Sequence, residues 1–358
     1  MAGMNRDVAN ALGAALLFGA STPVAKLLVG QASPWLLAGL LYLGSGLGLA
    51  LARLLRDGGW RPSGLARGEW PWLLGAIASG GALGPVALMA GLAHTGAATA
   101  SLLLNLEAVL TALIAWLVFR ENAGRRVVLG MAAIVAGGLV LAWPQGRAVA
   151  GGASGAFGMA AIMLACLCWA IDNNLTRKVA ATDALFVAAS KGLIAGTVNC
   201  ALAFAVAGAG DGGAALPGAG TALLIMAVGL LGYGASLVLF VLALRGLGTA
   251  RTGAYFSIAP FVGALVSIAL LGEPATPAFW VACALMGWGV WLHLTEHHEH
   301  LHTHEPVAHT HPHRHDEHHQ HVHDFAWDGR EPHSHPHRHA ALTHKHPHYP
   351  DIHHQHAH

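Results

Sequence analysis

Ten long apolar stretches follow one another through the first 295 residues, and short charged or glycine-rich breaks separate them. A helix needs about 20 mostly apolar residues to cross the hydrocarbon core of a membrane, and each stretch is close to that length. Further spans follow the first one, so we interpret it as a retained helix and not as a cleaved signal peptide. The pattern predicts ten membrane-spanning helices over residues 8–29, 33–54, 70–92, 97–119, 124–143, 155–176, 183–207, 219–244, 249–271 and 276–294.

The first half of this apolar region recurs in the second half. Residues 18–26 align with 169–177 at an offset of 151, and residues 99–121 align with 251–273 at an offset of 152. The near-constant offset favours a duplication over chance similarity between apolar helices. Each half then has five spans, and because five is odd the second half would lie upside down in the membrane, as in many secondary transporters. We therefore expect an all-α membrane protein with two inverted five-helix repeats.

The last 63 residues follow a different pattern. Residues 296–358 lack apolar periodicity and hold 24 of the 26 histidines. Histidine, proline and charged residues dominate there, so we expect a disordered segment without a packed core. The sequence thus predicts three regions: a first five-helix repeat at 1–150, a second at 151–295, and a histidine-rich tail at 296–358.

Composition narrows the class of protein. Hydrophobic residues make up 54% of the chain and charged residues only 10%, whereas soluble domains carry about 25% charged residues. The formal net charge of +1 is the sum of about +6 over residues 1–295 and −5 over the tail. This excludes a soluble enzyme with one core, and without a basic patch we expect no nucleic-acid partner. No GxxxxGK[ST] phosphate loop is present, so we expect an ion gradient to drive any transport, with no enzymatic activity and no tightly bound cofactor.

Lysine and arginine in the short loops set the orientation. If the N-terminus is cytoplasmic, twelve such residues lie on the cytoplasmic side and only Arg147 lies outside. Because positive charge favours the inner side, we expect a multi-pass protein of the bacterial inner membrane with both termini in the cytoplasm.

Polar residues inside the spans are the candidates for a transport path, because a charge at the bilayer centre is costly and is usually functional or paired. Asp172 and Lys191 are expected at similar depth, where they form either a structural ion pair or part of a site. Glu107 either stays protonated or binds a cation or proton. His94, at a helix end, is either an interfacial side chain or a late ligand. The candidate set is Glu107, Asn105, Asp172, Asn173, Lys191 and His94.

Histidines in the tail alternate with other residues, and the segment 309–315 recurs at 333–339. In an extended chain residues i and i+2 lie on the same side, so an HxH unit can offer two imidazoles to one ion, and imidazole suits nickel, cobalt, copper and zinc. A pH sensor and a merely solubilising tail are the alternatives. The predicted metal ligands are His300, His302, His304, His309, His311, His313, His315, His333, His335, His337, His339, His344, His346 and His348.

Two of the apolar runs resemble a known family. Residues 97–107, continuing to Phe119-Arg120-Glu121, resemble the fourth helix of EamA-type members of the drug/metabolite transporter superfamily, and residues 253–260, continuing to Gly272-Glu273, resemble the ninth. The resemblance implies ten helices in two inverted repeats that work by alternating access. It departs at Ala108, where the family usually has proline, so helix four is expected to be less bent.

The resemblance marks the fold far better than the substrate, because members of the superfamily export amino acids, sugars, nucleosides, drugs and metal ions. Some histidine-tailed transporters that this chain resembles are associated with nickel and cobalt resistance. We therefore expect proton-coupled export of a divalent transition-metal cation, nickel or cobalt first and zinc or copper next. The alternatives are a metabolite or amino-acid exporter whose tail only buffers or senses metal, and a membrane-anchored metal store. The expected partners are the lipid bilayer and metal ions, and a homodimer is left open.

Overall fold

The structure is a computed structural model of the 358-residue chain. The residues that it describes are 2–59, 61–118, 125–143, 152–179, 182–208, 216–240, 242–243, 252, 255–295, 298–304, 308–313, 333–338 and 342–348. The chain divides into two compact units, Met1–Glu296 and His297–His358, and each is described here by itself.

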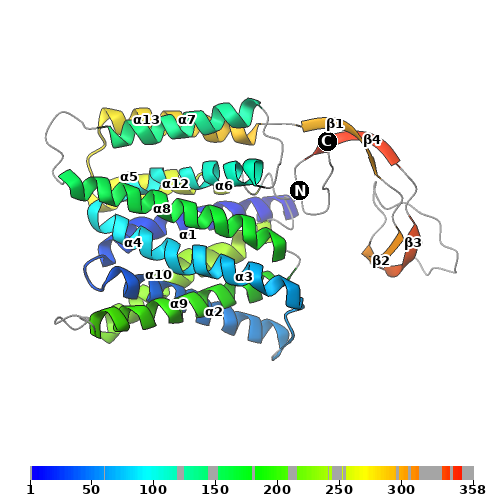
Figure 1. Cartoon of the computed structure of the whole chain (residues 1–358), viewed down its shortest axis with the longest axis horizontal. Helices are drawn as coiled ribbons and strands as arrows, with labels where there is room; N and C mark the ends of the chain where they lie inside the picture. The colour runs from blue at the N-terminus through cyan, green and yellow to red at the C-terminus, as the bar shows by residue number, and fades with distance from the viewer. Residues whose placement is uncertain are drawn as a thin grey trace. The chain divides into compact units, whose positions relative to one another are not determined.

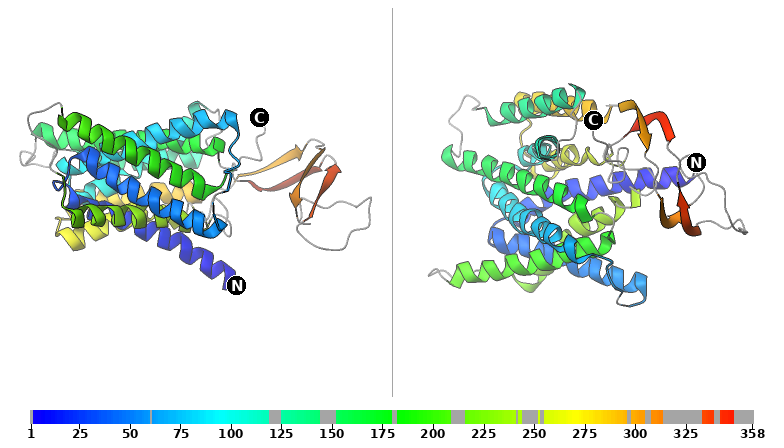
Figure 2. Two further views of the ribbon diagram at one scale, coloured as in Figure 1. Left: turned by 90° about the horizontal axis from the view of Figure 1, so that it is seen from below. Right: turned by 45° about the vertical axis from the view of Figure 1, so that its right-hand side comes forward.

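The first unit is helical, and its helices lie alongside one another (Figure 1). Views from other directions show that they form more than one layer (Figure 2). The first half contains α1 (Ala2–Leu28), α2 (Pro34–Asp57), the 3₁₀ turn η1 (Arg67–Glu69), α3 (Trp70–Ala76), the π-helix η2 (Ile77–Leu83), α4 (Gly84–His94), α5 (Ala97–Leu103), α6 (Leu106–Leu117) and α7 (Arg125–Ala142). The second half contains α8 (Gly152–Thr176), the 3₁₀ turn η3 (Arg177–Val179), α9 (Ala184–Gly208), α10 (Ala219–Gly229), the π-helix η4 (Leu230–Ala235), α12 (Ala259–Leu271) and α13 (Pro277–Leu294).

Most of the predicted stretches form apolar helices in the part of the chain that the structure describes. Among the described residues, nine helices are long and apolar enough to cross a membrane. The predicted span 249–271 is described only in part, and α12 within it is a shorter apolar helix. Ten spans, and their inverted arrangement, therefore stay a prediction.

Local signals start and stop the helices. The Ser33 hydroxyl accepts a hydrogen bond from Leu36 N at 3.3 Å at the start of α2, and the Thr276 hydroxyl accepts one from Phe279 N at 3.2 Å at the start of α13. Both satisfy backbone donors that have no partner inside the helix. Helix α2 ends at Gly58, whose positive φ of 64° suits glycine.

Helix α2 packs against α9 and α10 at glycines. A Cβ on Gly46 would lie 2.4 Å from the backbone N of Leu193, and one on Gly192 would lie 2.5 Å from the Cα of Gly46. On the neighbouring face, a Cβ on Gly44 would lie 2.0 Å from the backbone O of Met226. Lipid gives helices no hydrophobic reason to associate, so close backbone approach at small residues is what holds such a bundle together.

Helix four of the predicted set is interrupted, while its being less bent than in the family stays a prediction. A turn at Leu104 and Asn105 separates α5 from α6. The backbone N–H of Asn105 and that of Glu107 each bond to the carbonyl three residues back, and the Asn105 side chain donates to the same Leu102 carbonyl at 2.9 Å. An asparagine side chain that competes for a helix carbonyl can end an α-helix, so the break does not need a proline at position 108.

Irregular helical turns recur in the two halves at one spacing. The π-helices η2 and η4 begin 153 residues apart, at Ile77 and Leu230. The turn at 104–105 has a counterpart at 257–258, also 153 residues later, just before α12. This spacing agrees within two residues with the sequence offsets of 151 and 152, which supports a duplication.

The tail differs from the prediction of disorder. Its described residues form two separate antiparallel strand pairs, β1 (His298–His304) with β4 (Leu342–His348), and β2 (Ala308–His313) with β3 (His333–Arg338). The physical reason is the alternation that we interpreted only as a metal motif, because a period of two residues is also the period of a strand. The predicted ligands His315 and His339 lie outside the described residues.

Candidate functional site

A buried ion pair joins α8 to α9. The Lys191 ammonium donates to Asp172 Oδ1, and also to the Thr176 hydroxyl at 2.8 Å. The Thr176 hydroxyl in turn donates to Asp172 Oδ1 at 2.7 Å, and this contact is available because residues four apart lie on one helix face. The side chains of Lys191 and Asp172 are only 17% and 11% exposed. An ion pair between Asp172 and Lys191 was one of the two roles expected from the sequence, but Thr176 was not among the candidate residues.

A second polar contact lies one residue further along α8. Asn173 donates an amide hydrogen bond to Glu107 Oε1 at 2.8 Å and a longer one to the Thr111 hydroxyl at 3.4 Å. Asn174 donates to the Thr111 carbonyl at 3.3 Å. Glu107 and Thr111 both lie on α6, at i and i+4. Helix α8 therefore links Glu107 on α6 with Lys191 on α9.

Two other predicted site residues lie apart from this group. Asn105 is buried. Its side-chain amide donates a hydrogen bond to the Leu102 carbonyl and lies 3.9 Å from Met286 Sδ. It therefore shapes the break between α5 and α6, and its part in a site stays a prediction. His94 is exposed at the end of α4, where its Nδ1 lies 2.7 Å from the Ser154 hydroxyl.

The π-helix η2 contributes backbone carbonyls that sequence reasoning did not find. The Gly80 carbonyl accepts from the Tyr42 hydroxyl at 3.1 Å and from Trp169 Nε1 at 2.9 Å. The Ala82 carbonyl accepts from the Asn199 amide at 3.1 Å. A Cβ on Gly80 would lie 2.1 Å from Asp172 Oδ2, so glycine is needed where η2 passes the ion pair. A π turn often marks a functional position in a helix.

Metal ligands do not gather in the described part of the membrane unit. Nowhere among the described residues do three or more His, Cys, Asp or Glu side chains form a group that could hold a metal ion. A cavity of about 410 Å³ beside α6, α7 and α8 is lined by apolar and glycine residues alone, so it suits an acyl chain better than an ion. An ion on the predicted path would need ligands beyond Glu107 and Asp172.

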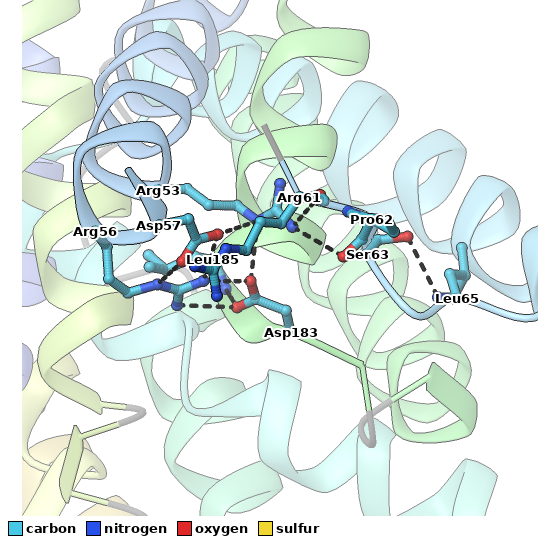
Figure 3. Close-up of polar contacts among 9 residues, drawn as sticks. All are labelled: Arg53, Arg56, Asp57, Arg61, Pro62, Ser63, Leu65, Asp183 and Leu185. Atoms are coloured by element: carbon cyan, nitrogen blue, oxygen red, sulfur yellow. Dashed lines mark hydrogen bonds and ion pairs between the residues drawn. The ribbon is translucent and has the colours of Figure 1, made fainter. Parts of the chain in front are cut away.

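Charged side chains also join α2 to α9 at one end of the bundle (Figure 3). The Asp183 carboxylate, just before α9, accepts from Arg53 Nε at 2.9 Å and from Arg56 Nη2 at 2.6 Å. Arg53 also donates to the Arg61 carbonyl at 2.9 Å, and Arg56 pairs with Asp57 at 2.7 Å. The hydrogen bonds from Arg56, followed by those from Arg53, hold the pKa of the Asp183 carboxyl well below its usual range.

Replacing Asp183 by asparagine is expected to lower the stability of the folded protein by about 1 kcal/mol near neutral pH. The expected loss of stability is small because the Arg56 side chain is 44% exposed, so water screens its attraction to Asp183. A carboxyl with a lowered pKa stabilises the fold above its unfolded pKa of about 3.9, and this stability is lost as the pH falls toward the folded value. Thermal unfolding in detergent should show a constant deficit between about pH 5 and 8 that shrinks below about pH 4. A deficit that persists unchanged in acid would contradict this origin.

The other end of the bundle has its own link between the halves. The Glu273 carboxylate, just after α12, accepts from the backbone N–H groups of Ala97 at 2.7 Å and Ala98 at 2.8 Å, at the start of α5. A negative charge suits a helix N-terminus. Lys26, on α1, donates to the carbonyls of Leu92 and Thr95 at the end of α4. The related Glu121 lies outside the described residues.

The apolar helices, the glycine packing between them and the few paired charges inside them define a multi-pass membrane protein. The chain belongs to the EamA-like transporter family, whose sequence profile matches it twice, over residues 7–143 and 156–295. The two matches fall one in each half, as a duplication requires.

The chain is also similar to individual proteins, of which two are described here. An uncharacterized transporter of Methanothermobacter thermautotrophicus (strain Delta H) is 23% identical over 296 residues, which cover 78% of this chain and 83% of the relative. A solved crystal structure of a protein superimposes with a TM-score of 0.56 at 20% identity, and the match covers 79% of this chain and 95% of that one. At that identity the second likeness concerns the fold alone.

Proposed function

We propose that this EamA-family transporter exports a divalent transition-metal cation from the cytoplasm, with nickel or cobalt first, in exchange for protons. The observation that carries the proposal is the tail, which holds 24 of the chain's 26 histidines. Imidazole is the side chain that best suits these metals at neutral pH. The tail would collect the ion on the side of the membrane from which it leaves.

Glu107 supports an exchange mechanism. Its carboxylate lies within the span Ala97–Leu117 and is bonded to the neutral amide of Asn173. An unpaired negative charge is costly inside a membrane, so this carboxyl would hold either a proton or a cation. Because both compete for the same oxygens, departure of one favours arrival of the other, which couples the two flows. Asp172 would contribute only if Lys191 released it.

Export of a zwitterionic metabolite is the second candidate, and the ion pair favours it. Lys191 and Asp172 offer opposite charges side by side. The Tyr42 ring, which lies 5.6 Å from that of Tyr233, is hydrogen-bonded to the same π-helix that Asp172 touches. A substrate with both an ammonium and a carboxylate group could exchange partners with this pair. The tail would then buffer or sense metal.

Cells that express the full chain should hold less nickel or cobalt than control cells, and Glu107→Gln should abolish the difference. Glutamine keeps the shape and removes the exchangeable charge. The matched control is Glu69→Gln, because the Glu69 carboxylate lies at the start of its span and accepts from the Ala66 N–H. Cell-associated nickel, cobalt and zinc would be measured by elemental analysis, with a truncation after Thr295 to isolate the tail.

Three experimental outcomes distinguish metal export, metal storage and metabolite export. If the full chain lowers none of these ions, metal export is wrong. If it raises cell-associated metal and the truncation does not, the protein is a store. If liposomes that contain the purified protein move an amino acid but no metal, and Lys191→Met stops that movement, the metabolite exporter is right.

A further inference from the structure

Helices α7 and α13 form a closely packed pair of their own, and they lie side by side in Figure 1. A Cβ on Gly137 would lie 3.0 Å from the backbone O of Ala282, and one on Gly289 would lie 2.6 Å from the backbone O of Gly130. Helices in a membrane approach each other this closely only at small residues. One face of α7 is therefore filled by α13.

The neighbouring face of α7 is packed loosely. Gly138 follows Gly137, so it points about 100° further around the helix. The atom nearest to a Cβ on Gly138 would be Leu106 Cδ1 of α6, at 3.7 Å, which is an ordinary contact distance. The cavity of about 410 Å³ lies on this side of α7, against α6 and α8. The described residues thus leave a space between α7 and these two helices.

Water does not suit this cavity. All of its lining residues lie in the described ranges, and none of them has a polar side chain. A buried water molecule needs roughly two to four polar partners, and cavities lined by apolar side chains stay dry. An unfilled space would also deprive its lining of dispersion contacts. The occupant that this lining favours is therefore apolar.

The cavity is accessible from the side that faces lipid. Three of its lining residues on α7 and α8 are at least half exposed: Leu139 at 63%, Met163 at 51% and Leu164 at 53%. Both helices are apolar and long enough to span the membrane, so this exposed surface lies against the hydrocarbon of the bilayer. The apolar molecules in direct reach of the cavity are lipid chains.

The length and depth of the cavity match one leaflet. Its lining includes residues 135–142 of α7 and 159–167 of α8 at their extremes, which correspond to about 10 Å and 12 Å of helix. One leaflet contributes about half of a hydrocarbon core that is about 30 Å thick. The cavity reaches Ala142 at the end of α7, and the adjoining Trp143 is 73% exposed. Tryptophan favours the membrane–water interface, so a lipid with its headgroup at this level could extend a chain along the cavity.

We propose that the cavity beside α6, α7 and α8 is a lipid site, which binds one acyl chain of a membrane phospholipid. The chain fills the space between the α7–α13 pair and the helices α6 and α8. Those two helices also carry the contact between Glu107 and Asn173. The bound lipid is thus a structural partner of the helices that hold this contact, and it is separate from the transported solute.

A leucine at position 138 should displace the chain, because Gly138 lines the cavity and has room for a Cβ. The matched control is Gly220→Leu, which adds the same side chain to an exposed glycine of α10 that has no other atom within 4 Å of its Cβ. The full-length protein would be placed in nanodiscs of phosphatidylethanolamine and phosphatidylglycerol. Part of the phosphatidylethanolamine would carry a photoreactive diazirine on its acyl chain, and the adducts would be located by mass spectrometry.

In the parent protein, adducts should be more frequent at Met163 and Leu164 than at Leu223 of α10, which is 66% exposed but lies outside the cavity. Retaining a lipid chain beside the added leucine would overpack the cavity, so adducts there should fall at least about fivefold in Gly138→Leu. Gly220→Leu should leave them unchanged. Equal labelling of Met163 and Leu223 would mean ordinary contact with lipid and would overturn the proposal. Protection of Met163 and Leu164 in the parent would mean that another occupant, such as a second copy of the chain, covers the cavity.

A thermal measurement provides an independent test. A ligand that binds only the folded protein raises its stability, so phospholipid added to protein in detergent should raise the midpoint of unfolding of the parent and of Gly220→Leu. The rise should be smaller in Gly138→Leu. If Gly138→Leu does not fold, Val135→Phe fills the same cavity from the next turn of α7 and should have the same effect. An equal rise in the parent and in the cavity-filling variant would overturn the proposal.

Discussion

Replacing Gly46 by valine is expected to prevent α2 from packing against α9, and to destabilise the bundle strongly. The added Cβ would meet the backbone of Gly192 and Leu193 at 2.4 to 2.6 Å, and backbone atoms cannot turn aside as a side chain can. Overpacking in a dense interior typically costs about 1–3 kcal/mol, and more where the clash is with the main chain. The midpoint of thermal unfolding in detergent should fall sharply, with loss of monodisperse protein.

The matched control is Gly220→Ala, because a Cβ on this glycine of α10 has no other atom within 4 Å. Alanine is the better helix former by up to about 1 kcal/mol, so this variant should be as stable as the parent or slightly more stable. If Gly46→Val and Gly220→Ala unfold at the same temperature, the close contact between α2 and α9 is not what holds this part of the bundle.

The second large effect is expected at Lys191. Lys191→Met should destabilise the protein by about 3 kcal/mol or more, because removing one partner of a buried ion pair leaves an uncompensated charge. Asp172 would keep the Thr176 hydroxyl as a donor but would lose its only cation in the described contacts. The double variant Asp172→Asn with Lys191→Met removes both charges and should recover most of the loss. Thermal unfolding of the parent, both single variants and the double variant measures the coupling.

The double variant also separates structural from functional roles. If the ion pair only holds α8 to α9, the double variant should fold and still transport. If it folds and transports nothing, the pair belongs to the transport path. A double variant that is no more stable than Lys191→Met would mean that the two groups do not act as a pair.

The apolar spans could be predicted from the sequence because a lipid bilayer permits few backbone structures. A span in a membrane must be long, apolar and helical, so the stretches could be found from composition alone, and within the described ranges nine of them are helices of sufficient length. The pairing of Asp172 with Lys191 could also be expected, because both are charged and lie at the same end of neighbouring spans. The role of that pair stays a proposal.

Other features of the structure could not be predicted from the sequence, because they depend on how distant segments pack together. Nothing in the run Ile77–Leu83 distinguishes a π-helix from an α-helix, so the acceptor at Gly80 and its donors Tyr42 and Trp169 appear only in three dimensions. The interruption of helix four could not be predicted either, since it lies at Asn105, whose side chain bonds to the Leu102 carbonyl. The register of the tail strands is likewise set by long-range pairing, which HxH spacing does not specify.

The two π-helices also bear on the history of the chain. A π turn contains more residues than an α turn, and a single inserted residue is the simplest way to make one in an existing helix. The π-helices that begin at Ile77 and Leu230 lie 153 residues apart, so each half of the chain carries one at the corresponding position.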